Sequence, residues 1–279
     1  PLMLNRRQLI GYSAAAAAVA TLPSVVAPTA DAATGRLLFD ASYATKSFTR
    51  YPDMNPNLAR VGSDFRLVAD PGNANRKVAL FDASRRLTQG NTYPRASVTT
   101  GEVFLPGQEY WASVSLLMPT KIANGDWNSV FTPAFGRPWV GPSPLGIAFQ
   151  PTARAGYNQL AFNRTASNGG VPMAPIPVQV GTWIQVIQHY QLATKAQGGF
   201  VEMWINQGPT ADSWRRVVTR TPIDALAPGT LPTYKQYSSV GSYGVTPHRL
   251  YVGDHKVAQH DQRLVALTDF GTWNGRLPA

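Results

Sequence analysis

The feature that most constrains this chain is a series of short runs in which apolar and polar residues alternate, separated by glycine and proline. Residues 109–117 and 199–205 are typical. Successive side chains of a strand point to opposite faces, so Val201, Met203 and Ile205 are expected to share one face. The other expected strands are residues 77–81, 97–100, 128–131, 145–149, 159–162, 182–190, 216–219, 234–243 and 249–252.

The turn residues between these runs help to define the fold class. The chain has 23 prolines and 24 glycines, spread as turn signals. After the N-terminal region we find no convincing run with the 3.6-residue period of a helix. About a dozen short strands without helices predict an all-β sandwich or barrel, and at this length a jelly-roll β-sandwich is expected.

The N-terminal region has the composition of an export signal. Residues 5–10 read Asn-Arg-Arg-Gln-Leu-Ile, an alanine-rich run occupies residues 13–20, and Ala-Asp-Ala at 30–32 is a small-x-small cleavage site. The alanine-rich run is too short to span a membrane well. We therefore expect residues 1–32 to be a removable twin-arginine signal. Residues 33–279 would then be one secreted domain with no membrane association.

The charge balance is strongly basic. The net charge is +10, from 25 basic and 15 acidic residues, and removing Arg6, Arg7 and Asp31 leaves 23 − 14 = +9. Only 6 of the basic residues are lysine, and arginine is suited to bidentate recognition of carboxylates and phosphates. The balance favours an acidic polysaccharide, a nucleic acid or an anionic cell wall, or simply keeps the protein soluble. The chain has no cysteine, so its fold does not depend on disulfides.

Several segments, in their order along the chain, resemble one family. They are Leu38-Phe39-Asp40, Tyr93-Pro-Arg95-Ala-Ser97-Val98, the hairpin of residues 181–189 and 199–206, Tyr237-Ser-Ser239-Val-Gly241-Ser-Tyr243 and Tyr251-Val-Gly-Asp254. Together they resemble the concanavalin A-like jelly-roll polysaccharide lyases related to heparin lyase I and to the glucuronan and alginate lyases. The resemblance covers nearly the whole of residues 33–279.

The chain departs from the family pattern at three places. Ser97 stands where the family has the glutamate of R-x-E, and Ser239 stands where it has a lysine. The family's Q-x-H strand is expected near residues 128–135, which contain neither glutamine nor histidine. Two functions therefore stay open: a secreted lyase of acidic polysaccharide, or a non-catalytic glycan- or cell-wall-binding protein on the same scaffold.

The resemblance implies β-elimination at a uronate and assigns its two main groups. Arg95 would bind the uronate carboxylate, and Tyr243 would transfer protons. A strand period of two places Tyr237 and Gly241 on the same face as Tyr243, and a sugar ring is expected to approach the backbone at Gly241. The predicted binding residues of these strands are Ser97, Thr99, Lys235 and Tyr237.

Three further segments supply candidates. His248 lies near Tyr243 in the sequence and is a possible substitute for the missing family histidine, although it is equally a plain turn residue. Arg249 follows it and is a predicted binding residue. Arg137 and Trp139 lie in a loop rich in glycine and proline, where Trp139 would stack on a sugar ring or cover the core.

Other chemistries have weak signals. The E-x-D-x-x-E strand of sandwich glycosidases is absent, and neither Asp254-His255 nor His260-Asp261 is a metal signature. No phosphate-binding loop is present, so we expect neither a metal nor another cofactor. Basic and aromatic residues are not interleaved on one strand, so a nucleic-acid partner is not expected. The sequence does not predict an oligomeric state.

Overall fold

Strands dominate the part of the chain that the computed structural model describes, residues 36–43, 65–83, 94–100, 104–136, 143–162, 174–207, 213–226 and 236–259. The strands are β1 (Arg36–Ser42), β2 (Phe65–Asp70), β3 (Asn73–Asp82), β4 (Arg95–Thr99), β5 (Glu109–Leu117), β6 (Asn128–Gly136), β7 (Ile147–Gln150), β8 (Tyr157–Phe162), β9 (Ile176–Gln179), β10 (Trp183–Gln191), β11 (Phe200–Asn206), β12 (Trp214–Pro222), β13 (Gln236–Gly244) and β14 (Arg249–Gln259). A short 3₁₀ turn, Lys195–Gln197, precedes β11.

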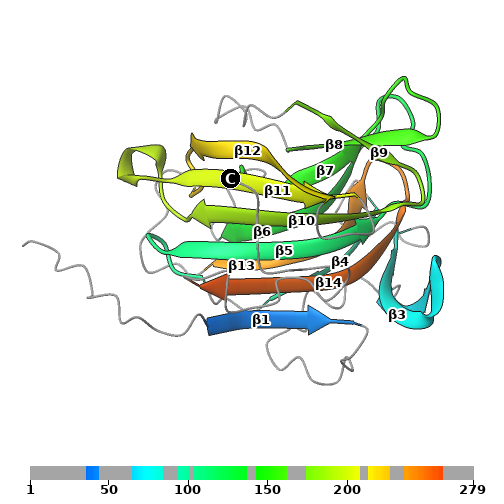
Figure 1. The fold of residues 1–279 in the computed structure, drawn as a ribbon, viewed down its shortest axis with the longest axis horizontal. Helices are drawn as coiled ribbons and strands as arrows, with labels where there is room; N and C mark the ends of the chain where they lie inside the picture. The colour runs from blue at the N-terminus through cyan, green and yellow to red at the C-terminus, as the bar shows by residue number, and fades with distance from the viewer. Residues whose placement is uncertain are drawn as a thin grey trace, which may run out of the picture. The chain divides into compact units, whose positions relative to one another are not determined.

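The described strands form two antiparallel sheets. The larger sheet has the order β12-β11-β10-β5-β14-β3-β2, with β1 also paired to β14, and the smaller sheet has the order β4-β13-β6-β7-β8-β9. Figure 1 shows β11, β10, β5 and β14 as successive neighbours in the larger sheet. The chain alternates between the sheets from β3 to β6 and again from β13 to β14. Strands far apart in sequence therefore become neighbours, which is the arrangement of a jelly-roll sandwich.

The core lies between the inner faces of the sheets and follows from side-chain alternation. On β11, Val201, Met203 and Ile205 belong to the main apolar cluster, whereas Trp204 belongs to a separate cluster. Burying a large apolar side chain contributes about 1.5 to 3 kcal/mol. The alternation expected for this strand is therefore confirmed.

Two hydrogen bonds join the sheets through the core. Tyr190 of β10 donates its hydroxyl to the Pro133 carbonyl oxygen of β6 over 2.9 Å. The Ser238 hydroxyl of β13 lies 2.8 Å from Nε2 of His255 on β14. Burial lowers the pKa of His255 to about 3, because the apolar interior disfavours the imidazolium. The neutral imidazole is therefore the form that fits the core.

The predicted all-β jelly-roll sandwich is confirmed. The expected strand at residues 109–117 is β5, and the expected hairpin is the antiparallel pair β10–β11. Strands β1, β2 and β9 were not among the strands expected from the sequence. The signal predicted for residues 1–32 lies outside the described residues. Among the residues that are described, no helix is long and apolar enough to cross a membrane.

Candidate active site

The outer face of the smaller sheet carries the partly exposed polar residues of β13. Tyr237, Ser239 and Tyr243 are partly exposed, whereas the intervening Ser238 and Val240 are buried. Because strand side chains alternate, the three partly exposed residues share the face opposite the core. This is the shared face expected from the sequence.

Strand β4 brings Arg95 next to Tyr243 on this face. The two residues are directly opposite each other in the register, and Ser97 lies opposite Gly241. Nε of Arg95 donates to the Ser97 hydroxyl over 2.9 Å. The guanidinium carbon of Arg95 lies 5.6 Å from the ring centroid of Tyr243, within reach of a cation–π attraction.

Arg95 is partly buried, and two tyrosines influence its guanidinium electrostatically. Burial lowers the pKa of Arg95, while Tyr237 and Tyr243 act in the opposite direction. No carboxylate among the described residues is ion-paired with Arg95, although ion pairs are found elsewhere on both sheets. An arginine keeps its charge in a protein, so Arg95 is a cation without an ion-pair partner among the residues that the structure describes.

Strand β6 contributes hydroxyl groups on the other side of β13. Ser129 lies opposite Tyr243, and Thr132 lies opposite Ser239. Both are partly exposed. Trp127, just before β6, packs edge-on against Tyr243 with 5.2 Å between ring centroids. No sequence pattern marks these residues, because their place beside Tyr243 comes from the pairing of β6 with β13, which are distant in sequence.

Thr99 lies at the other end of the β4–β13 pair, opposite Ser239. It is 3% exposed. Within the described part of the chain its Oγ1 has no hydrogen-bond partner. Buried hydroxyls nearly always have such a partner, and the oxygen of Thr99 is too deeply buried for a ligand to touch it in this structure.

Gly241 has a different role from the one expected. A Cβ atom at this position would lie 2.2 Å from the Ala96 carbonyl oxygen and 2.4 Å from the Ser97 Cα of β4. The space beside Gly241 is therefore filled by the neighbouring strand. Glycine is needed here for the close approach of two strands, and the sugar contact inferred from its missing side chain is not supported.

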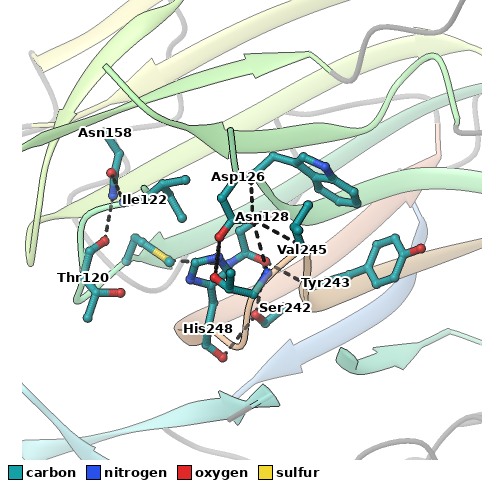
Figure 2. Close-up of polar contacts among 12 residues, drawn as sticks. Thr120, Ile122, Asp126, Asn128, Asn158, Ser242, Tyr243, Val245 and His248 are labelled. Carbon is teal, nitrogen blue, oxygen red and sulfur yellow. Dashed lines mark hydrogen bonds and ion pairs between the residues drawn. The ribbon is translucent and has the colours of Figure 1, made fainter. Parts of the chain in front are cut away.

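The structure does not place His248 with Arg95 and Tyr243. Its side chain is 5% exposed, and its Nε2 lies 2.8 Å from Oδ2 of Asp126. It follows the turn after β13, and its ring packs so close to Gly244 that a Cβ there would lie 3.0 Å from His248 Cδ2. Figure 2 shows the phenol of Tyr243 directed away from this imidazole. The geometry supports a structural role for His248.

Asp126 is the centre of the network that holds His248. Its Oδ1 accepts hydrogen bonds from the backbone N–H groups of Trp127 and Val245, at 2.7 and 3.0 Å, and the Thr246 hydroxyl also donates to its carboxylate. Burial alone would raise the pKa of Asp126, but the hydrogen bonds from Thr246 and Trp127 and the attraction of His248 outweigh it and lower the pKa. The ionised carboxylate therefore ties the turn after β13 to the residues before β6 (Figure 2).

The remaining predicted binding residues are not part of the described cluster. Arg249 begins β14 in the larger sheet and donates from Nε to Oδ2 of the buried Asp82 over 3.0 Å. Lys235, Arg137 and Trp139 lie outside the described residues. Among the residues that the structure describes, no group of three His, Asp or Glu side chains is arranged to hold a metal ion.

Comparisons with known proteins show similarity at the level of fold. No family model matches the chain, and no curated protein matches it. Among solved structures, an alginate lyase from Pseudomonas aeruginosa is 13% identical, with a TM-score of 0.45 over 74% of this chain and 91% of that one. A carbohydrate esterase from a Shiga toxin-encoding bacteriophage is 8% identical, with a TM-score of 0.45 over 81% and 100%. A GH131 β-glucanase domain from Podospora anserina is 12% identical, with a TM-score of 0.43 over 81% and 86%.

Proposed function

We propose that this protein is a secreted polysaccharide lyase that cleaves an acidic, uronate-containing polysaccharide by β-elimination. The observation that carries the proposal is the state of Arg95. It is partly buried, lies beside the ring of Tyr243, and has no paired carboxylate among the described residues. Such an arginine is suited to a carboxylate supplied by the substrate, and the net charge of +10 suits a polyanionic one.

The chemistry requires charge neutralisation and two proton transfers. Loss of the C5 proton of the uronate places negative charge on its carboxylate, which Arg95 stabilises. Tyr243, adjacent to Arg95, removes this proton as the phenolate and then returns a proton to O4 as the C4–O4 bond breaks. The tyrosine thereby ends in its starting state, and the product carries a C4–C5 double bond. In this scheme no step needs a histidine.

The neighbouring hydroxyls would hold the sugar. Thr99 has a buried hydroxyl without a partner among the described residues, and Tyr237, Ser129 and Thr132 line the same face. The partly exposed hydroxyls of Tyr237, Ser129 and Thr132 are the ones that a sugar can reach, and the binding role expected for Thr99 remains a prediction. The stacking role expected for Trp139, and the binding roles expected for Arg137 and Lys235, remain predictions.

A second function is favoured by one observation. None of the described histidines lies on this face: His248 is in the Asp126 network, His255 is in the core, and His189 is on the larger sheet. Ser129 and Thr132 stand on the strand where the family resemblance implies a glutamine and a histidine. A non-catalytic glycan- or cell-wall-binding protein would need only the cation and the hydroxyls.

One experiment separates the two functions. The mature protein is incubated with a panel of polyuronates, and the ultraviolet absorbance of the C4–C5 double bond is recorded. A lyase produces a rising signal with at least one polymer. Retention on an acidic glycan column that salt abolishes, without any rise in absorbance, would instead establish the binding function.

Export is a separate part of the proposal and rests on the twin-arginine pattern at residues 5–10. The test is N-terminal sequencing of protein recovered from the culture medium. We expect the mature chain to begin at Ala33. An intact N-terminus found only in the cytoplasm would contradict export without touching the catalytic assignment.

A further inference from the structure

Strand β13 carries a bulge next to Tyr243. Its register against β4 is continuous. Against β6, however, Val240 lies opposite Phe131 while Tyr243 lies opposite Ser129, so β13 has one extra residue between the two pairs. A bulge interrupts the ladder of hydrogen bonds and re-aims the side chains beside it. The position of the Tyr243 phenol therefore depends on how this bulge is held.

The side chain of Asn128 holds the bulge. Its Oδ1 accepts the backbone N–H of Tyr243 over 2.8 Å and lies 3.1 Å from the Ser242 hydroxyl (Figure 2). The backbone N–H of Tyr243 can only donate a hydrogen bond. The oxygen of the Asn128 amide, and not its nitrogen, must therefore face β13. Asn128 is fully buried, and its Nδ2 lies 3.5 Å from the sulfur of Met118.

On the side that faces β4, strand β13 is packed tightly. Next to Gly241, the space that a Cβ would fill is occupied by the Ala96 carbonyl oxygen of β4. The strand is thus packed tightly on one side and held by Asn128 on the other. Loss of the Asn128 amide would free the β6 side, where the bulge lies next to Tyr243.

We propose that Asn128 is a positioning residue that aims the phenol of Tyr243 at the substrate beside Arg95. The inference rests on the proposed function of Tyr243, because the expected catalytic effect exists only if that phenol transfers protons. Asn128 does not itself contact the substrate in this arrangement.

Asn158 of β8 provides a matched control. It is also buried, its Oδ1 accepts the backbone N–H of Ile122 over 2.8 Å, and its Nδ2 donates to the Thr120 carbonyl oxygen over 2.9 Å. Figure 2 shows it holding the segment before β6, with the Tyr243 ring pointing elsewhere. Substitution of Asn128 or Asn158 by alanine leaves one buried backbone donor unsatisfied, so the two variants should lose similar stability.

The kinetic test uses the full chain and the polyuronate that the wild type cleaves. Asn128→Ala should lower kcat by on the order of 10², the cost of misplacing a reacting group by about 1 Å, with KM unchanged. Asn128→Asp keeps an oxygen acceptor and should recover most of kcat. Asn158→Ala should keep kcat while its urea midpoint falls as far as that of Asn128→Ala. Equal kcat in the two alanine variants would overturn the proposal.

A second readout is independent of activity. 3-Fluorotyrosine at position 243 reports the surroundings of the ring through its ¹⁹F chemical shift. Asn128→Ala should move or broaden this signal, whereas Asn158→Ala should not. An unchanged signal in Asn128→Ala would refute the positioning role. If the signal responds but the wild type cleaves no polyuronate, the proposed function fails and the positioning of Tyr243 stands.

Discussion

The outer faces of the two sheets carry similar side chains, but the two described clusters differ in whether their charges are ion-paired. On the larger sheet, Nδ1 of His189 lies 2.7 Å from Glu202 and its Nε2 contacts Glu109. Arg216 pairs with the same Glu202 over 2.6 Å, and Trp111 stacks on the imidazole with 3.8 Å between centroids. Each of these charges has a partner within the protein, so the cluster links β5, β10, β11 and β12.

The smaller sheet differs from the larger one at Arg95. Arg95 has a serine and two phenols around it, and no carboxylate among the described residues is paired with it. A buried or partly buried charge without a partner weakens the fold. The contrast teaches that arginine content alone does not locate a site; Arg95 is distinguished by its partly buried place beside Tyr243, without an ion pair among the described residues.

Removal of the Tyr243 phenol is the most severe test of this contrast. Tyr243→Phe deletes the oxygen and keeps the ring that packs on Trp127. We expect kcat to fall by a factor on the order of 10²–10⁴, the usual contribution of general acid–base catalysis, while glycan binding persists. Tyr251→Phe on the larger sheet should leave kcat unchanged. Full activity in Tyr243→Phe would remove this tyrosine from the mechanism.

Arginine substitutions test the two faces directly. Arg95→Ala should lower kcat/KM by on the order of 10²–10³, because a desolvated charge pair with the substrate is lost. Arg249→Ala breaks the ion pair with Asp82 on the larger sheet, so it should reduce thermal stability and leave kcat/KM unchanged. A loss of kcat/KM in Arg249→Ala would restore the binding role predicted for it from the sequence.

Acid should weaken the connection between the sheets. Burial lowers the pKa of His255 to about 3 in the folded state, from 6.5. The unfolded chain therefore binds this proton first, and stability falls as the pH drops from 6.5 towards 3. For such a shift the loss between pH 8 and pH 5 is about 2 kcal/mol.

Urea unfolding of His255→Leu isolates this contribution. The variant keeps the apolar contacts of the site, and Ser238 keeps its hydrogen bond to the Thr132 carbonyl oxygen over 3.2 Å. It should show a smaller loss of unfolding free energy between pH 8 and pH 5 than the wild type. The same pH dependence in both proteins would assign the acid sensitivity to other groups.

The smallest change is expected for the matched cluster of the larger sheet. Glu202→Gln removes the charge that faces His189 and Arg216. We expect a loss of about 1 kcal/mol of unfolding free energy, because the glutamine amide keeps a hydrogen-bonding oxygen, and no change in kcat or KM. A kinetic effect here would show that the two faces are coupled.

The strands were predictable because the alternation of their side chains is visible within each short segment of sequence. The alternation in residues 109–117 and 199–205 separates the residues of the main core from those of the other face, although both faces of these strands are buried, and that period of two is visible in any single strand. The shared face of Tyr237, Ser239 and Tyr243 follows from the same period. Strand β9 was missed because its four residues, Ile176–Gln179, include a proline and are too few to show a period.

The sequence by itself determined the all-β class and the alternation of the strands, and its resemblance to a family pointed to Arg95 and Tyr243 as candidate groups. Only the tertiary structure decided which residues contact one another in the candidate site. It placed Asn128 and Trp127 beside Tyr243 and directed His248 to Asp126. These contacts join residues more than 100 positions apart, and which strand neighbours which depends on how two whole sheets bury their inner faces together. No local pattern in a sequence records that choice.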